Sequence, residues 1–432
     1  MKILIANYRY FVSSGPERYM FNLMNMLTAM GHTPMPFSIH YSGNVATPYA
    51  KYFVEPLGCR DEVYFDQHRR SPRALLPTLS RLWYSREVES AIARMAEETR
   101  PDVAYVLCYL RKLSPSLLVG LKKKNIPIAA RLPDYAMLCP ELHCLKDLVP
   151  CTLCVKGSLF HSVRHRCVKR SYTISILNAL TTWYHRSRGF FDFIDIFVTT
   201  NPFMREMMLR AGYGEERLCC IPTFTDLEAF RPPGPPSRSR YIVYVGRIDR
   251  PKGLHVLIKA FALLQELGAA DVILKVVGSG HDAHYVGEVK DLVREDGLED
   301  VVEFLGDVEA GAIPGLLGNA LFSVVPSVWY ENLPNSLLES LASGTPVIAS
   351  NIGSLGSAVT DGVDALLFRP GDPADLAAKM LRLLEDEALR ETLSRNGSET
   401  AIRQYSPQAH MAKLVALFEA LASKSRPVPG RN

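Results

Sequence analysis

Two glutamates, Glu331 and Glu339, are the sharpest chemical feature of the sequence. Glu331 stands just before an expected helix, which Asn332 can cap and whose first turn tolerates Pro334. At 1.5 Å of rise per residue, the two carboxylates are roughly 9–11 Å apart along the helix axis. One can then hydrogen-bond to a sugar and the other to a ribose, with a diphosphate at the helix N-terminus between them. The alternative is that Glu331 only favours the helix dipole and Glu339 faces solvent.

Two cations, Arg247 and Lys252, follow another expected strand and are candidates to bind the diphosphate of the same ligand. The run Tyr241–Gly246 predicts a buried strand, and both cations follow it within one short turn. Ligands of open α/β sheets bind at the carboxyl ends of the strands. Two cations at this position can neutralise a diphosphate leaving group. The alternative is a pair of unrelated surface charges.

Apolar β-branched runs alternate with helical patterns and supply the elements that carry these residues. Such runs are typical of parallel strands covered by helices on both faces. The expected strands are Lys2–Ala6, Ile126–Leu132, Phe197–Thr200, Tyr241–Gly246, Val272–Val277, Val301–Leu305, Phe322–Pro326 and Pro346–Ser350.

The chain divides at residues 231–239, where four prolines within five positions can continue neither a helix nor a central strand. We interpret this segment as a linker between an N-terminal Rossmann-like domain, residues 1–230, and a C-terminal domain, residues 240–404. Residues 405–432 are expected to form a last helix and a tail. A surface loop within one domain is the alternative interpretation of the proline run.

Composition and charge exclude several classes of protein. The 47% hydrophobic and 22% charged residues are ordinary for a packed protein and exclude disorder as the main state. The net charge of +4 is too small to indicate a nucleic-acid binder. Polar Asn7 and Arg9 interrupt the apolar start too soon for a secretory leader, and no apolar run is long enough to span a membrane. We therefore expect a cytoplasmic protein with reduced cysteines.

Five cysteines lie within 29 residues, at positions 139, 144, 151, 154 and 167. Cys151 and Cys154 form a C-x-x-C knuckle, and with Cys139 and Cys167 they have the composition of a structural zinc site. Such a metal would hold an insert at about 134–170 and take no part in catalysis. The alternative is a group of reduced thiols that pack as small hydrophobic side chains.

A basic stretch follows the cysteines. There is no acidic residue between Asp147 and Asp192, whereas seven Lys and Arg residues lie there, with Trp183 and Tyr184 beside them. A basic segment with aromatic residues suits an anionic membrane surface or a lipid-diphosphate acceptor. A solvated helix face is the alternative.

The motifs of the second half follow one another in a specific order. They are Gly246-Arg247, Lys252-Gly253, Val277-Gly278-Ser279-Gly280, Phe304-Leu305-Gly306, Glu331 with Glu339, and the run from Ser343 to Ser350. This order and spacing resemble the retaining glycosyltransferases of family 4, which have the GT-B fold. Residues Ser14 to Arg18 resemble the family's Gly-Gly-x-Glu-Arg turn, so the resemblance extends over nearly the whole chain.

The resemblance implies α/β architecture, with two Rossmann-like doubly wound domains facing a central cleft, and a role for each matching residue. The donor diphosphate is expected at Arg247 and Lys252, with Gly15 allowing the N-terminal domain to close over it. Glu331 would contact donor sugar hydroxyls, and Glu339 the nucleotide ribose. The other expected donor contacts are Gly278, the loop around Val308, and the backbone amides of Asn332 and Leu333. The family needs no metal for its chemistry.

The acceptor side departs from the family pattern. Pro133 stands where the family often has a histidine near the acceptor, and Thr223 stands where it usually has an asparagine. Asp134 is the nearest titratable group and is the candidate to orient or deprotonate the acceptor hydroxyl. A helix cap or turn residue is the alternative role for Asp134.

The sequence therefore predicts an enzyme that moves a hexosyl group, with retention of configuration, from a nucleotide-diphosphate sugar to a saccharide or lipid-linked acceptor. The resemblance implies polysaccharide biosynthesis at the inner face of the cell membrane. One alternative is a nucleotide-sugar-binding module without transferase activity. Another is a GT-B epimerase or phosphorylase, which needs no separate acceptor or uses inorganic phosphate. The motifs do not specify the sugar, the base or the acceptor.

Overall fold

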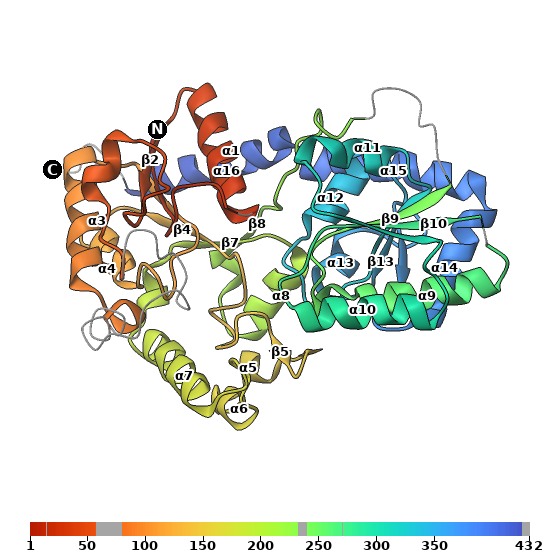
Figure 1. The fold of residues 1–432 in the computed structure, drawn as a ribbon. Coiled ribbons are helices and arrows are strands. Elements are labelled where there is room, and N and C mark those ends of the chain that lie inside the picture. The colour runs from red at the N-terminus through yellow and green to blue at the C-terminus, as the bar shows by residue number, and fades with distance from the viewer. Residues whose placement is uncertain (14, 58–79, 232–239, 270, 426–432) are drawn as a thin grey trace.

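The computed structural model describes residues 1–13, 15–57, 80–231, 240–269 and 271–425. Over these residues the chain forms two six-stranded parallel sheets and one short hairpin (Figure 1). The first sheet has the order β2 (Thr33–Phe37), β1 (Lys2–Ala6), β3 (Val103–Val106), β4 (Ile128–Arg131), β7 (Ile196–Thr199), β8 (Leu218–Cys220). The second has the order β11 (Val302–Gly306), β10 (Ile273–Val277), β9 (Tyr241–Val245), β12 (Phe322–Val325), β13 (Val347–Ser350), β14 (Leu366–Phe368).

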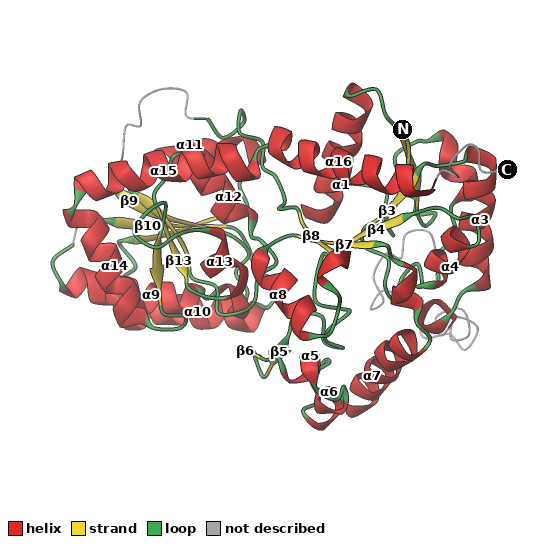
Figure 2. Cartoon of the chain, turned by 180° about the vertical axis from the view of Figure 1, so that it is seen from behind, coloured by secondary structure: helices red, strands yellow, loops and turns green. Residues whose placement is uncertain are grey.

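Helices connect the strands and cover both sheets (Figure 2). In the first half they are α1 (Gly15–Ala29), α3 (Arg86–Thr99), α4 (Ser116–Lys122), α5 (Leu153–Lys156), α6 (Phe160–Arg164), α7 (Tyr172–Ser187) and α8 (Pro202–Arg210). The second half has α9 (Leu254–Glu266), α10 (Ala283–Glu295), α11 (Ile313–Gly318), α12 (Asn335–Ala342), α13 (Gly353–Ala358), α14 (Pro373–Glu385), α15 (Glu387–Tyr405) and α16 (Pro407–Ser425). The 3₁₀ turns are η1 (Pro48–Tyr52), η2 (Phe190–Phe193), η3 (Glu215–Arg217), η4 (Arg250–Lys252) and η5 (Ala310–Ala312), and the hairpin is β5 (Leu145–Lys146) with β6 (Val149–Pro150).

Both faces of each sheet are buried, which explains the uninterrupted apolar character of the strands. Successive residues of a strand point to opposite faces. Along β1, Ile3 and Ile5 pack with α1 and α16, whereas Leu4 and Ala6 pack with the cluster that contains α3 and α4. The second sheet is likewise covered by α9, α10 and α14 on one face and by α11, α12 and α15 on the other (Figure 1). The predicted class, two doubly wound α/β units, is confirmed.

The last helix, α16, packs on the first sheet although it follows the second sheet in the chain. Its apolar stripe includes Met411, Leu414 and Phe418, all buried with residues of β1, β3 and α1. The Tyr19 hydroxyl and the His410 ring nitrogen Nε2 lie 3.0 Å apart within this contact. Helix α16 therefore brings the chain back from the second sheet to the first.

All eight predicted strands are present, with ends shifted by two residues at most. Four strands of the two sheets were missed. Strand β2 was missed because it contains Pro34 and Pro36. Proline is tolerated there because β2 is an edge strand and needs fewer backbone donors. The other three, β3, β8 and β14, have only three or four residues and carry too little periodic signal.

Two expectations fall partly outside the described residues. Of the predicted linker at 231–239, residues 232–239 are not described, and Ser14 in the first turn is not described either. The division of the chain at this linker stays a prediction. Within the described residues, no helix combines the length and hydropathy that crossing a bilayer requires.

Candidate active site

Two adjoining cavities lie between the two sheets. One has a volume of about 590 Å³ and the other about 350 Å³. Pro16, Arg131, Pro133 and Asn332 line both, so the cavities meet along these four residues. Since Arg131 ends β4 and Arg247 follows β9, the carboxyl ends of strands from both sheets face the larger cavity.

The wall of the larger cavity is predominantly cationic. Asp134 and Glu331 are the acidic side chains in its lining. The basic residues of the same wall are Arg111, Lys112, Arg131, Arg247 and Lys252. Such a wall favours an anionic ligand.

Glu331 and Lys252 form a buried ion pair inside this cavity. The Lys252 Nζ donates to Glu331 Oε1 at 2.7 Å, and the Ser327 hydroxyl donates to the same oxygen at 2.8 Å. Burial by itself raises the pKa of Glu331, but the Lys252 charge and these hydrogen bonds outweigh it and hold the pKa below its usual range. Glu331 is therefore a fixed, ionised hydrogen-bond acceptor.

The turn that carries Lys252 depends on a glycine. Gly253 has a φ of +75°, and a Cβ there would overlap the carbonyl oxygen of Pro326. This close approach brings η4 against the loop that follows β12 and therefore brings Lys252 to Glu331. The predicted neighbours Lys252 and Glu331 are thus held together by backbone packing.

Arg247 is the more accessible of the two predicted cations. Its side chain is 61% exposed, and its Nη1 lies 2.9 Å from Asp249 Oδ2. Lys252 is only 19% exposed. Arg247 therefore has a guanidinium edge available for a ligand in the cavity, whereas Lys252 already serves Glu331.

Asp134 lies in the same cavity, on the side of the first sheet. Its Oδ1 accepts a hydrogen bond from the Ala136 amide at 2.8 Å. This bond is typical of a turn residue, which is the alternative role that the sequence left open for Asp134. Burial raises the pKa of Asp134, and the Ala136 amide opposes this only in part. A carboxylate with a raised pKa is a better proton acceptor than an exposed one.

Asn332 joins the two halves of the protein. Its Nδ2 donates to the carbonyl oxygens of Pro133 at 2.7 Å and Leu132 at 3.2 Å. The Thr200 hydroxyl donates to its Oδ1, and the Asn201 amide donates to its carbonyl oxygen. The prediction that Asn332 caps the helix is wrong. Helix α12 begins at Asn335 without a side-chain cap, and the Asn332 amide bonds to the turn after β4 instead.

The smaller cavity has two helix N-termini in its wall. Gly15 begins α1 and Asn335 begins α12, and a Cβ at Gly15 would lie 3.7 Å from Asn335 Nδ2. Free amides at both helix starts favour an anion between them. Glu339 and Leu333 line the same cavity. Burial raises the pKa of Glu339, and the charge of Arg18 opposes the shift.

Gly278 and Val308, two of the expected donor contacts, are not among the lining residues of either cavity. Gly278 has a φ of +124°, and a Cβ there would overlap the Gly246 carbonyl oxygen. It therefore permits the close approach of the chain just before Arg247. Val308 packs against the cluster of Tyr241 and Val243.

Arg131 was missed as a candidate site residue. It lines both cavities, its Nη2 donates to the Thr223 hydroxyl, and its guanidinium lies 4.2 Å from the centroid of the Tyr19 ring. The sequence feature that could have identified Arg131 is its position as a charged residue at the carboxyl end of an apolar strand. Trp329 and His143 also line the larger cavity and were missed; their ring centroids lie 5.1 Å apart with the planes tilted by 45°.

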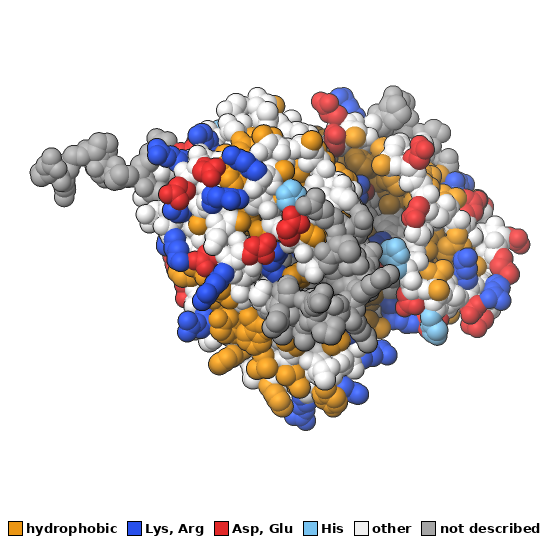
Figure 3. All heavy atoms as spheres, turned by 60° about the vertical axis from the view of Figure 1, so that its left-hand side comes forward, with side chains coloured by type: hydrophobic (Ala, Val, Ile, Leu, Met, Phe, Trp, Pro, Cys, Tyr) orange, Lys and Arg blue, Asp and Glu red, His pale blue; other side chains and the backbone are white. Residues whose placement is uncertain are grey.

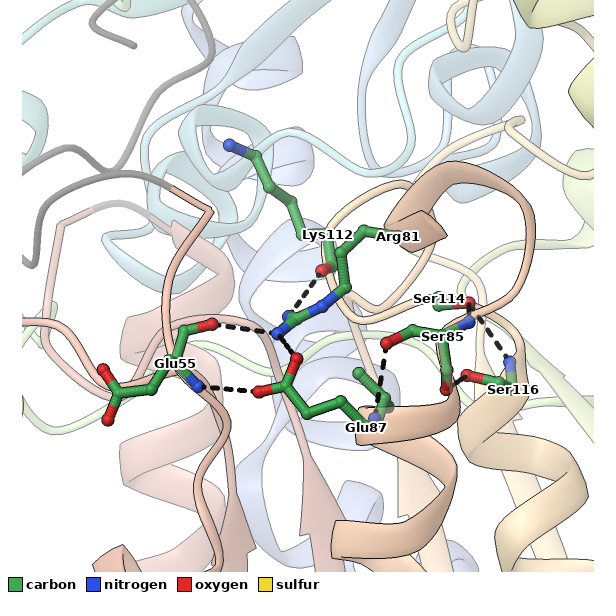
Figure 4. A network of polar contacts seen from close by, with 8 residues as sticks. Glu55, Arg81, Ser85, Glu87, Lys112, Ser114 and Ser116 are labelled. Carbon is green, nitrogen blue, oxygen red and sulfur yellow. Dashed lines mark hydrogen bonds and ion pairs between the residues drawn. The ribbon is translucent and has the colours of Figure 1, made fainter. Parts of the chain in front are cut away.

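A buried arginine fixes the loop that carries Arg111 and Lys112 (Figure 4). Arg81 donates to the carbonyl oxygens of Glu55 at 2.9 Å and Lys112 at 3.4 Å, and pairs with Glu87 at 2.7 Å. Because this guanidinium is only 3% exposed, it binds the carbonyls without competition from water. Arg81 therefore helps to fix the backbone at Lys112, which carries part of the basic wall of the larger cavity.

The predicted zinc ligand set is not found. Among the residues that the structure describes, no group of three or more His, Cys, Asp or Glu side chains is placed to hold a metal ion. The four predicted cysteines do line one small cavity, together with Cys144. The Cys139 sulfur has hydrogen bonds with Cys144 and Cys154, which lower its pKa. Cys151 and Cys167 are half-buried free thiols.

Sequence comparison places the second sheet in a known family of domains. Residues 226–400 match the family model described as Glycosyl transferases group 1. A D-inositol 3-phosphate glycosyltransferase of Nocardiopsis dassonvillei is 34% identical over 209 residues, which are 45% of this chain and 48% of the relative. A phosphatidyl-myo-inositol mannosyltransferase of Mycobacterium leprae is 29% identical over 196 residues, 45% of this chain and 50% of the relative. The chain thus matches about half the length of these curated relatives.

Structural comparison extends the similarity to the whole chain. The structure of Anabaena Alr3699/HepE in complex with UDP superimposes with a TM-score of 0.67 at 19% identity, covering 98% of this chain and 100% of HepE. At this identity the similarity shows the fold alone. The fold is GT-B.

Proposed function

Because residues 226–400 belong to the glycosyl transferases group 1 family and the chain has the GT-B fold, we propose that this protein is a retaining hexosyl-type glycosyltransferase. It moves a sugar from a nucleotide-diphosphate donor to a saccharide or lipid-linked acceptor. The observation that carries the proposal is the arrangement of Arg247, Lys252 and Glu331 in a cavity that adjoins the N-termini of α1 and α12.

The donor diphosphate lies where the two cavities meet. Arg247 and Arg131 contribute charge, and the first amides of α1 and α12 contribute dipoles. The nucleotide then extends into the smaller cavity, where Glu339 is positioned to accept from ribose hydroxyls. Structures of HepE with UDP and with UDP-glucose support a nucleotide-sugar ligand for this fold.

The sugar occupies the larger cavity, with Glu331 accepting hydrogen bonds from its hydroxyls. In the reaction, the bond between the anomeric carbon and the phosphate oxygen breaks, and the acceptor oxygen bonds to the same carbon. Negative charge grows on the departing diphosphate, and fixed cations stabilise it. The acceptor hydroxyl loses its proton either to the departing phosphate oxygen or to Asp134. No resident metal is required for these steps.

The acceptor class rests on the relatives and on the chain's own surface. Two relatives are named for glycosyl transfer to inositol 3-phosphate and to phosphatidyl-myo-inositol. For this chain we expect a hydroxyl acceptor in a saccharide or lipid-linked molecule, used in cell-surface polysaccharide biosynthesis. Its place is the cytoplasmic side of the cell membrane, as a peripheral protein.

Two other functions are kept as alternatives. A binding module without transferase activity would bind the nucleotide sugar and not release the nucleotide when acceptor is added. A GT-B epimerase or phosphorylase would turn over without a separate acceptor or with inorganic phosphate. The ionised, buried Glu331 favours an enzyme, because a buried ion pair costs desolvation energy that simple nucleotide binding does not require.

Arg247→Ala is expected to weaken binding of the matching nucleoside diphosphate by about tenfold, as loss of a charge-assisted hydrogen bond implies. Binding of the nucleoside without phosphates should not change. Titration calorimetry with UDP, GDP, dTDP and their nucleosides measures both. The control is Arg294→Ala, because Arg294 is equally exposed on α10 and outside both cavities. Equal losses for nucleoside and nucleoside diphosphate would remove Arg247 from the diphosphate site.

A further inference from the structure

Helix α7 buries its polar residues and exposes its apolar ones. Tyr172, Ile176, Leu180 and Trp183 follow one another at spacings of three and four, so they share one face of the helix, and they are 43–59% exposed. The residues that it buries are Ser175, Asn178, Ala179, Thr181, Thr182 and His185. A surface helix of a water-facing protein has the opposite pattern.

The buried polar side chains are satisfied, so this orientation is fixed. Asn178, Thr181 and Thr182 each donate to the helix's own carbonyl oxygens four residues earlier, at 2.8–2.9 Å. His185 Nε2 lies 2.9 Å from the Leu82 carbonyl oxygen. Because these groups need no water, α7 can keep its apolar face outward.

The apolar surface continues onto the neighbouring elements. Val149 in β6, Leu153 in α5 and Phe160 in α6 are 46–64% exposed. Of the 17 exposed large hydrophobic residues among the described residues, nine fall within 148–183, so the exposure is concentrated there. Figure 3 shows hydrophobic side chains gathered at the lower end of the molecule, where α5, α6 and α7 lie in Figure 1.

The same segment has positive charge only. Residues 148–191 contain no Asp or Glu. The exposed cations among them are Lys156, Arg164, Arg166, Lys169, Arg170 and Arg188. Blue side chains lie beside the hydrophobic ones at this end of the molecule in Figure 3. A protein partner with an ordinary mixed surface does not require this combination, whereas an anionic lipid surface does.

We propose that the surface formed by β6, α5, α6 and α7 binds to an anionic lipid bilayer. The apolar side chains enter the boundary between headgroups and acyl chains, with Trp183 and Tyr172 at the depth that amphipathic rings prefer. The surrounding cations contact anionic headgroups. The inference rests on the peripheral membrane location proposed above and names the surface responsible for it. Docking of this kind needs no transfer activity, so its test is separate from the test of transfer.

The docking surface is connected directly to the larger cavity. Arg186 of α7 donates to the carbonyl oxygens of Met137 and Leu138, at 2.6 Å and 3.2 Å. Met137 and the preceding turn with Asp134 line that cavity. The same arginine side chain thus links the helix of the proposed docking surface to the part of the cavity wall that contains Asp134.

Vesicle co-sedimentation of the full chain tests the proposal. We expect binding to phosphatidylcholine vesicles that also contain phosphatidylglycerol, weak binding to phosphatidylcholine alone, and loss of binding as salt is added. Leu180→Ser/Trp183→Ser should weaken binding at least about tenfold. Arg166→Gln/Lys169→Gln/Arg170→Gln should weaken it similarly, on the anionic vesicles only.

Matched controls distinguish binding through α7 from binding through any exposed apolar side chain. Leu263→Ser/Leu267→Ser removes two exposed leucines near the end of α9 and should leave vesicle binding unchanged. Circular dichroism of each variant should match the parent protein. Equal binding by the α7 variant and the parent protein would overturn the proposal. Failure of the parent protein to bind either kind of vesicle would also overturn it. A parent protein that forms dimers, with the dimers lost in the α7 variant, would do so as well.

Discussion

Glu331→Gln is expected to reduce sugar transfer by at least about 100-fold, the effect of removing one fixed electrostatic group from an active site. The amide keeps the size of the side chain but loses the charge that the pair with Lys252 holds in place. Nucleoside diphosphate affinity should stay within about threefold, because Glu331 is assigned to the sugar, whereas the ribose contact lies in the other cavity and the diphosphate where the two cavities meet. The measurement is initial rate and nucleotide affinity on the same preparation.

Glu295→Gln is the matched control for this variant. Glu295 is an exposed residue in the last turn of α10 and lines neither cavity. Its replacement should change neither rate nor affinity. A Glu331→Gln enzyme with the parent rate would contradict the assignment of Glu331 to the reacting sugar.

Lys252→Met is expected to destabilise the protein by about 3–5 kcal/mol at neutral pH, because it leaves a buried carboxylate without its cation. For a cooperative unit of the size of residues 240–404, this corresponds to a melting temperature lower by roughly 6–20 °C. The double variant Lys252→Met/Glu331→Gln should recover part of the loss, since no buried charge remains. Thermal unfolding of the four proteins in this cycle gives the coupling energy of the pair.

The pH dependence of this loss has a definite sign. In the parent protein Lys252 holds the folded-state pKa of Glu331 below its ordinary value, so the pair stabilises the fold above that ordinary pKa and less so as pH falls. Without Lys252, burial prevails and raises the folded-state pKa. The Lys252→Met protein should therefore lose stability as pH rises through the range above the ordinary Glu pKa.

An exposed pair provides the control. Arg294 and Asp291 are 64% and 53% exposed, so Arg294→Met should change stability by less than about 1 kcal/mol, with little dependence on pH. If Lys252→Met behaved like Arg294→Met, the Lys252–Glu331 pair would be no more than a surface contact.

The sequence was sufficient to predict that Arg247, Lys252 and Glu331 lie close together, because each is tied to the end of a recognisable element, whereas their roles stay predictions. Arg247 and Lys252 follow a strong strand signal and must lie at its carboxyl end, and Glu331 precedes a recognisable helix. Lys252 meets Glu331, 79 positions later, because β9 and β12 are neighbouring parallel strands whose carboxyl ends lie at one edge of the sheet. Gly253 completes the arrangement through a positive φ that few other residues adopt.

The errors arose where contacts come from distant parts of the chain. Asn332 has the composition of a helix cap, yet its amide bonds to Pro133, about 200 positions earlier. Arg131 lines both cavities because the two sheets face each other. Local sequence patterns do not show how two sheets are arranged. The part of Gly278 that the structure shows is its close approach to the Gly246 carbonyl oxygen, and its contact with the donor stays a prediction.

The insert was the least predictable segment. Its cysteine spacing indicated a metal site, whereas the described side chains form no such ligand group. Its basic character was visible in the sequence, but the outward apolar face of α7 was not. Thr181 and Thr182 bond to the helix's own carbonyls, which let the helix bury a polar face that its sequence assigns to solvent.

The most direct measurement is the anomeric configuration of the sugar that the protein first releases from its donor. The chain would be incubated with α-linked UDP-, GDP- and dTDP-sugars, and early product would be followed by proton NMR alongside nucleotide release. The account predicts turnover of one donor, with the α anomer formed first and no turnover by Glu331→Gln. Initial release of the β anomer, or no turnover of any donor with added saccharide and lipid-linked acceptors, would contradict it.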